Sequence, residues 1–103
     1  MKAAFSRAAT RDFVEVVDFI SSESRRAANR FIDEVEDALI RIGRHPQIGV
    51  ERRELADPPV RFWTLQRYPY LMVYDAAVSP PAILRILHGS RDLPELLSGL
   101  RSD

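Results

Sequence analysis

Two amphipathic helical segments joined by a short polar break place the strongest constraint on what this chain can fold into. The first segment, residues 7–22, carries an apolar stripe at helical spacing, made by Ala9, Phe13, Val16, Val17 and Ile20. A second stripe follows in residues 25–44 and stops before His45-Pro46, because proline disfavours helical backbone in the residue before it. So short a break predicts antiparallel helices, and each stripe then needs another layer to cover it.

Three strand-like runs follow the helices and can supply that layer. Residues 60–66, 70–78 and 82–88 are rich in β-branched, aromatic and aliphatic side chains, with turns at residues 67–69 and 79–81. Residues 2–5 predict a further strand, and Ser6 predicts the cap of the first helix. The class is α+β, ordered β-α-α-β-β-β-α, with a helical hairpin packed on a small antiparallel sheet.

Two other segments complete the prediction. Residues 46–59, with a charged cluster and Pro58-Pro59, predict an exposed loop. Leucines at positions 93, 96, 97 and 100 predict a short C-terminal helix that begins at Asp92 and Pro94.

Length and composition predict one cytoplasmic domain without a cofactor. With 103 residues, 46% of them hydrophobic, the chain matches a single domain over residues 1–103. It shows no apolar run long enough to span a membrane and no signal peptide, which predicts a cytoplasmic location. Because cysteine is absent and only two histidines occur, we expect no disulfide, no thiolate chemistry and no metal site.

Charge is balanced over the whole chain but unevenly distributed. Fifteen basic and fifteen acidic residues exclude the strong field of a protein that coats nucleic acid. Between positions 52 and 91, however, six arginines accompany three acidic residues, so the sheet region is mildly basic. Arginine suits bidentate contact with phosphate or carboxylate, although a general preference for arginine explains the pattern equally well.

The last strand-like run leads directly into the candidate site. Arg85 interrupts apolar residues, and its charge needs a wet, paired or ligand-occupied surface. Gly89 lets the chain turn, which brings His88 and Arg91 close together. His88 is either a proton-transfer group or a hydrogen-bonded structural histidine at the strand end. The two arginines either contact a macromolecule or pair with Asp75, Asp92 or the end of the C-terminal helix.

Several motifs resemble the RelE/ParE toxin superfamily of bacterial type II toxin-antitoxin modules. The resemblance covers nearly the whole chain and is most specific in residues 86–92, Ile-Leu-His-Gly-Ser-Arg-Asp, which are typical of the ParE branch. Its other elements are Ser6 with Asp12-Phe13 and Ile20, Ala28 and Phe31, His45-Pro46 with Gly49, Arg53-Glu54-Leu55 before Arg61, and Tyr70 with Val73-Tyr74.

The two branches of the superfamily imply different activities. RelE-like members cut messenger RNA on the ribosome, and ParE-like members bind and poison DNA gyrase. Cleavage needs a proton acceptor, a proton donor and cations for the developing charge. Arg91 matches the arginine that follows the last strand in RelE, but Leu71 and Leu97 stand where the RelE pattern has arginine and tyrosine, and residues 62–64 replace its lysines. The resemblance therefore favours a ParE-like gyrase inhibitor.

This interpretation gives a set of expected site residues and partners. Target binding is expected at Arg61, Arg85, His88 and Arg91, with Arg61 included on the condition that strand register aligns it with the others. The partners implied are DNA gyrase and a ParD-like antitoxin in a hetero-oligomer, with no membrane and no direct sequence-specific binding of nucleic acid. The antitoxin would use the exposed sheet edge or the helical hairpin. The alternatives are a RelE-like ribonuclease using His88 and Arg91, and an inactive member that only binds antitoxin.

Overall fold

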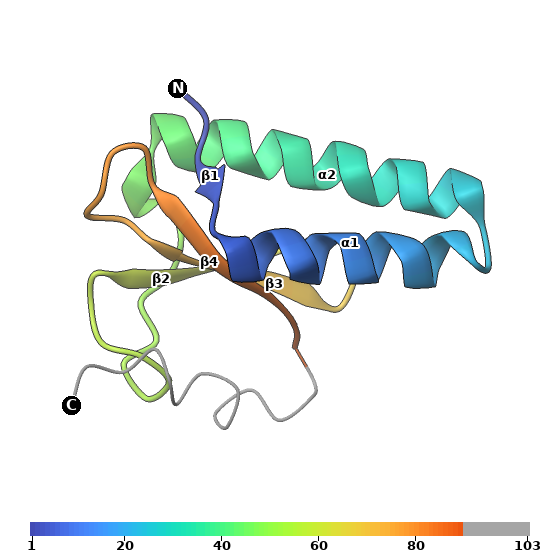
Figure 1. Cartoon of the computed structure of the whole chain (residues 1–103). Helices are drawn as coiled ribbons and strands as arrows, with labels where there is room; N and C mark the ends of the chain where they lie inside the picture. Colours follow the sequence, from blue (N-terminus) through green and yellow to red (C-terminus); the bar gives the residue numbers. More distant parts are fainter. Residues whose placement is uncertain (90–103) are drawn as a thin grey trace.

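The computed structural model describes residues 1–89, in which two long helices pack on one four-stranded sheet (Figure 1). The elements are β1 (Ala4–Phe5), α1 (Arg7–Ser21), α2 (Arg25–Arg44), the short 3-10 helix η1 (Pro46–Ile48), β2 (Val60–Thr64), β3 (Tyr70–Asp75) and β4 (Ala82–His88). The predicted α+β class is confirmed. The C-terminal helix expected after residue 92 lies outside the described residues.

Both helices begin at serine caps, as local sequence predicts. The Ser6 hydroxyl accepts a hydrogen bond from the Ala9 N–H at 3.0 Å, and the Ser24 hydroxyl accepts one from the Ala27 N–H at 3.1 Å. The helix α2 ends at Arg44, directly before His45-Pro46.

Gly43 lies inside the last turn of α2. Its lack of a side chain gives the N-terminal segment room, because a Cβ here would lie 1.8 Å from the Met1 carbonyl oxygen. The N-terminal segment therefore crosses α2 at this glycine on its way into β1.

The sheet has the strand order β1-β4-β3-β2. The strands β2, β3 and β4 form the predicted antiparallel meander, with Phe62 opposite Val73 and Leu71 opposite Leu87. The prediction of a purely antiparallel sheet is wrong, however, because β1 pairs parallel to β4 through Ala4 opposite Ala82. The sheet is mixed because the two helices of the hairpin intervene between β1 and the meander, and they provide the long crossover that a parallel pair needs.

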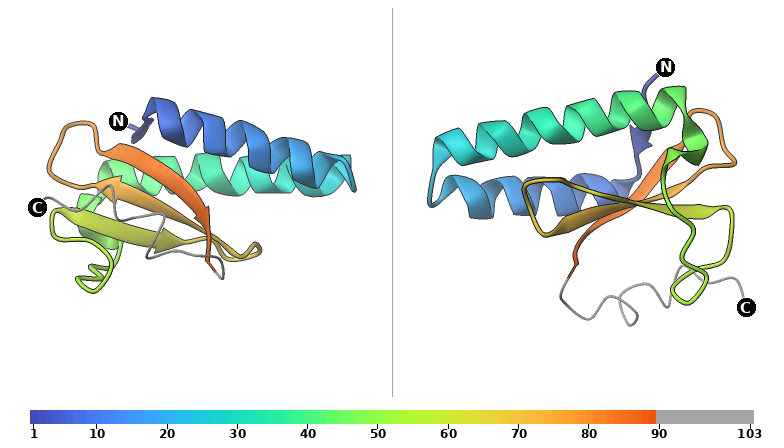
Figure 2. Two further views of the ribbon diagram at one scale, coloured as in Figure 1. Left: turned by 60° about the horizontal axis from the view of Figure 1, so that its bottom comes forward. Right: turned by 180° about the vertical axis from the view of Figure 1, so that it is seen from behind.

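Both helices cover the same face of the sheet (Figure 2). Phe31 and Ile42 of α2 are fully buried there, together with Met72, Tyr74 and Ile83 of the sheet. This cluster buries the apolar stripes of both helices against the sheet. Burial of the helical hairpin and formation of the sheet therefore depend on each other.

The opposite face of the sheet carries a second apolar cluster. Phe62, Val73 and Leu87 are buried there beside Leu55 and Ala56, which belong to the segment between η1 and β2. The prediction that residues 46–59 are an exposed loop is therefore wrong for these two residues. Turns within the segment bring both side chains onto the sheet, where their burial stabilises an otherwise polar connection.

Two strands are shorter than their apolar runs predict. The strand β2 stops at Thr64: the Leu65 N–H still donates to the Tyr70 carbonyl of β3, but the N–H groups of Gln66 and Arg67 donate to the Glu34 carboxylate instead of a strand. The strand β3 stops at Asp75, whose Oδ1 accepts the Ala77 N–H at 2.8 Å and forms a local turn.

Candidate functional site

The carboxylate of Asp12 joins α1 to the edge of β4. Its Oδ2 accepts hydrogen bonds from Arg85 Nε at 2.7 Å and from the Ile86 N–H at 3.0 Å, and its Oδ1 accepts one from Arg85 Nη2 at 3.0 Å. The strand β1 pairs with β4 only at Ala82 and Ile83. Asp12 therefore replaces a neighbouring strand at Ile86, beyond the end of β1.

This contact identifies the ion-pair partner of Arg85, which the sequence alone does not show. The alternatives were contact with a macromolecule or pairing with Asp75, Asp92 or the end of the C-terminal helix, whereas the structure pairs the guanidinium with Asp12 of α1. The hydrogen bonds to Asp12 raise the pKa of Arg85 above its ordinary value, so the side chain stays charged. A bidentate pair of this kind fixes the strand on the helix and does not leave the guanidinium unpaired.

His88 lies at the end of β4, opposite Tyr70 of β3. The two rings meet edge to face with their centroids 5.3 Å apart, and Tyr70 in turn meets Phe31 of α2 at 5.8 Å. A cavity of about 260 Å³ opens beside them and is also lined by Glu15 and Phe19 of α1. We call Asp12, Tyr70, Arg85 and His88 the β4 corner. Aromatic packing fixes the half-buried His88 ring within it.

Arg61 is not part of the β4 corner. It lies opposite Tyr74 on β3, whereas His88 lies opposite Tyr70 at the other end of that strand, and β3 and β4 separate Arg61 from the β4 edge. The expected common basic face therefore does not form at Arg61. This is a matter of strand register, which the sequence does not specify.

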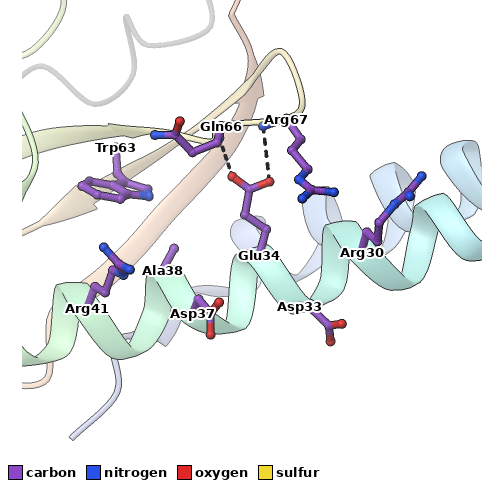
Figure 3. Close-up of a pocket in the computed structure, with 9 residues that line it drawn as sticks. All are labelled: Arg30, Asp33, Glu34, Asp37, Ala38, Arg41, Trp63, Gln66 and Arg67. Atoms are coloured by element: carbon purple, nitrogen blue, oxygen red, sulfur yellow. Dashed lines mark hydrogen bonds between the residues drawn. The ribbon is translucent and has the colours of Figure 1, made fainter.

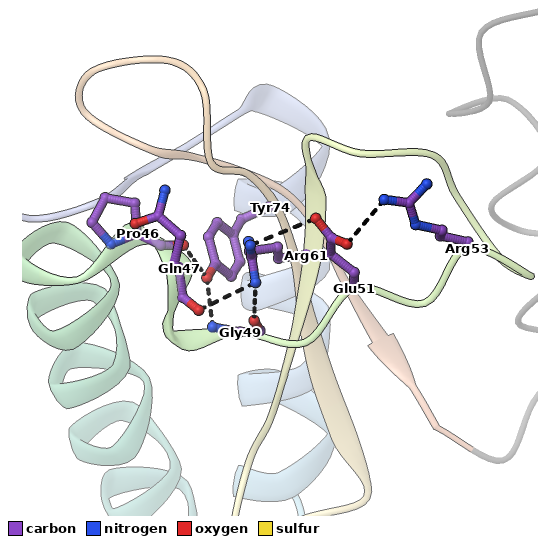
Figure 4. Close-up of polar contacts among 7 residues, drawn as sticks. All are labelled: Pro46, Gln47, Gly49, Glu51, Arg53, Arg61 and Tyr74. Carbon is purple, nitrogen blue, oxygen red and sulfur yellow. Dashed lines mark hydrogen bonds and ion pairs between the residues drawn. The ribbon is translucent and has the colours of Figure 1, made fainter.

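The guanidinium of Arg61 instead holds the chain that leaves η1 (Figure 4). Its Nη1 donates to the carbonyl oxygens of Gln47 at 3.2 Å and Gly49 at 2.7 Å, and its Nη2 lies 3.6 Å from Glu51 Oε2. Through these contacts the Arg61 guanidinium has a structural role, because it holds residues 46–51 in place.

Tyr74 lies under the same segment (Figure 4) and links it to the core. Its hydroxyl accepts the Gly49 N–H at 2.8 Å and donates to the Pro46 carbonyl at 2.6 Å. A Cβ at Gly49 would lie only 2.7 Å from this hydroxyl, which accounts for glycine at this position. Burial raises the pKa of Tyr74, and the Gly49 hydrogen bond and the Arg61 charge offset part of that increase.

We expect the raised pKa of Tyr74 to make stability depend on pH in the alkaline range. An unfolded tyrosine loses its proton near pH 10, whereas the folded protein retains it to higher pH. Because the unfolded state then binds fewer protons, the free energy of unfolding should fall as pH rises above about 10. Urea unfolding at several pH values measures this effect. Tyr74→Phe should lose about 1–2 kcal/mol at neutral pH and show a weaker alkaline decline; an unchanged decline would exclude Tyr74 as its source.

Sequence reasoning missed two carboxylates that position the functional elements. Asp12 and Glu34 read as ordinary polar residues on helix surfaces, yet each accepts backbone N–H groups from the sheet region. An arginine within a strand indicates that its guanidinium needs a partner such as a carboxylate, but the sequence does not show which carboxylate this is. Arg91, the remaining predicted site residue, lies outside the described residues.

Comparison with known proteins identifies the family. Residues 3–93 match the family model described as the ParE toxin of the type II toxin-antitoxin system, parDE. The chain belongs to the ParE toxin family. A search of curated proteins gave no match. A solved structure, described as the chromosomal ParDE TA system from P. aeruginosa, has the same fold with a TM-score of 0.69 at 21% identity, covering 85% of this chain and 95% of the other.

Within residues 1–89, no three histidine, aspartate or glutamate side chains gather closely enough to hold a metal ion. Over the same residues, no helix has both the length and the apolar character required to cross a bilayer.

Proposed function

We propose that this ParE-family toxin inhibits DNA gyrase by binding it, without catalysis, and acts in the cytoplasm. Its functional surface is the β4 corner together with Arg91. A ParD-like antitoxin neutralises it. The family match supports the toxin assignment, and the nature of the β4 corner supports binding over chemistry.

The observation that carries this proposal is the burial of Leu71. This residue stands where the RelE pattern has an arginine, and it is 6% exposed within the second apolar cluster. Phe62 is buried in the same cluster, so neither position can present a cation to a phosphate. RNA cleavage needs such cations beside its proton-transfer groups, and this part of the sheet supplies packing in their place.

Within this proposal the four predicted target-binding residues have two roles. His88 and Arg91 contact the target. Arg85 and Arg61 position other groups, because the guanidinium of each donates hydrogen bonds within the chain. Arg85 aligns the strand that carries His88, and Arg61 holds residues 46–51.

The antitoxin forms the second part of the proposal. The similar solved structure belongs to a ParDE system, which supports a ParD-like partner for this chain. The surfaces available to it include exposed apolar side chains of α1: Val14 is 50% exposed, and Phe19, which lines the cavity beside His88, is 60% exposed. A partner helix could bury these side chains.

Induction of the chain alone in bacteria tests the proposal. We expect growth arrest, a DNA damage response and intact transcripts, because a trapped gyrase complex breaks DNA and leaves messages uncut. Co-expression of the cognate antitoxin should restore growth. Cleaved transcripts with undamaged DNA would contradict gyrase inhibition and indicate a ribonuclease. Normal growth with the soluble protein present would indicate an inactive member that binds only antitoxin.

Substitution of the site residues locates the functional surface. Arg91→Ala and His88→Ala should each relieve growth arrest by removing a target contact. The matched control is Arg53→Ala, whose side chain is 72% exposed on the segment before β2 and lies outside the β4 corner. Circular dichroism of each variant verifies folding. Toxicity that survives both site substitutions in folded proteins would place the functional surface elsewhere.

A further inference from the structure

A groove runs between α2 and the hairpin that joins β2 to β3 (Figure 3). Its cavity volume is about 570 Å³, within the range of sites that bind small ligands or short polymer segments. We call it the α2 groove. The lining residues that matter to its chemistry are Arg30, Glu34 and Arg41 of α2, Trp63 of β2, and Gln66 and Arg67 of the hairpin.

The α2 groove presents three arginines to an anionic ligand, although its lining also includes three acidic residues, Asp33, Glu34 and Asp37. Arg30, Arg41 and Arg67 are exposed, and none of them makes an ion pair with another residue in the range 1–89. In Figure 3 the Arg41 side chain extends toward Trp63 at one end of the groove, and Arg30 and Arg67 lie at the other end. Anionic groups at both ends of the groove would therefore meet guanidinium groups.

The acidic residues of the α2 groove are oriented differently from its arginines. The Glu34 carboxylate accepts the backbone N–H groups of Gln66 and Arg67, so these donors partly satisfy it. Asp33 and Asp37 point away from Trp63, toward the outer side of α2 (Figure 3). Both aspartates line the groove on its α2 side, so an anionic ligand should be held nearer to Trp63 and the arginines than to them.

Trp63 adds a surface for stacking. Its indole is half-buried and lies in the wall of the groove, with the Gln66 amide beside it (Figure 3). Nucleobases stack on tryptophan with little dependence on sequence, and an amide can hydrogen bond to a base edge. An aromatic platform between two basic ends matches the alternation of base and phosphate along a nucleic acid strand.

We propose that the α2 groove binds a short segment of single-stranded nucleic acid, largely independently of sequence. A duplex fits less well, because its bases are stacked on one another and cannot offer their faces to Trp63. An acidic peptide would meet the same arginines but has no aromatic face of its own to place on the indole. The groove lies on α2 and the β2–β3 hairpin, so this activity is separate from the β4 corner and does not depend on gyrase inhibition.

The chain carries its own reporter for this binding, because Trp63 is its only tryptophan. Titration of the purified protein with oligothymidylate of about eight nucleotides should quench Trp63 fluorescence as bases stack on the indole. Three phosphate contacts predict that the logarithm of affinity falls with the logarithm of salt concentration with a slope of about −2. A duplex of the same length should quench far less.

Arginine variants connect the quenching to the α2 groove. Arg41→Ala and Arg67→Ala should each weaken binding roughly fivefold and reduce the salt slope by about 0.7. The matched control is Arg26→Ala, an exposed arginine of α2 outside the groove lining, which should change neither quantity. All three side chains are exposed, so the variants should fold.

Three results would overturn the proposal. The first is no quenching by oligothymidylate at low salt. The second is quenching that Arg26→Ala weakens as much as the groove variants do, which would indicate diffuse attraction to basic residues. The third is a response of Trp63 to polyglutamate that exceeds its response to oligothymidylate, which would identify the α2 groove as a site for acidic peptides.

Discussion

Replacing Phe31 with alanine is expected to lower the free energy of unfolding by about 3–5 kcal/mol, the largest effect of any single substitution considered for this chain. The side chain is 0% exposed at the centre of the first apolar cluster. Its ring stacks on Phe13 with centroids 6.0 Å apart and meets Tyr68 and Tyr70 edge to face at 5.4 and 5.8 Å. Truncation would leave a cavity that rigid neighbouring rings cannot fill.

Phe19→Ala is the matched control for this prediction. It removes the same phenyl group from the other helix, where the side chain is 60% exposed, so stability should change by no more than about 0.5 kcal/mol. Urea unfolding followed by circular dichroism measures both variants. Equal losses in the two would show that helix composition, and not the buried ring, determines the result.

The Phe31 substitution should also affect the β4 corner. Phe31 packs on Tyr70, and Tyr70 packs on His88, so these three rings connect α2 to the end of β4. Loss of the first ring removes a support for the second. We therefore expect the His88 imidazole resonances in a nuclear magnetic resonance spectrum to shift in Phe31→Ala and to stay in place in Val14→Ala, because Val14 is 50% exposed and does not line the cavity beside His88.

Features governed by near neighbours in the sequence were predictable. Ser6 caps α1 through an N–H only three residues later, and Pro46 ends α2 through its effect on the preceding residue. The antiparallel meander of β2, β3 and β4 could also be predicted from the sequence, because turn residues separate three runs of strand-forming side chains. Each of these inferences uses physical chemistry that acts over a few residues.

Features that depend on distant residues were not predictable in the same way. Asp12 and Arg85 are 73 positions apart, and Glu34 reaches a hairpin that lies 32 positions further on. The composition of each helix surface gives no sign of these contacts. The position of Arg61 also depends on strand register. Until the pairing of β2 with β3 is known, the sequence does not show whether Arg61 lies near His88 or at the other end of the sheet. The sequence thus indicated Arg85 and His88 of the β4 corner but not the Asp12 contact that positions the strand carrying them.

Asp12→Ala tests that contact directly and should destabilise the chain by about 2–3 kcal/mol. The substitution leaves the Arg85 guanidinium and the Ile86 N–H without their acceptor, at a point where β1 no longer covers β4. The pair is only 13% and 29% exposed, so water compensates less than at the surface. Arg53→Ala removes half of an exposed ion pair and should cost less than about 0.5 kcal/mol.

The double variant Asp12→Ala/Arg85→Ala separates the ion pair from the capping of the strand edge. If the main cost of Asp12→Ala is an uncompensated guanidinium, removing both partners should cost clearly less than the sum of the single variants. The remaining loss then belongs to the Ile86 N–H, and hydrogen exchange at this amide should be faster in both variants that lack Asp12. Additive losses, with exchange at Ile86 unchanged, would show that the Asp12 carboxylate does not hold α1 on β4.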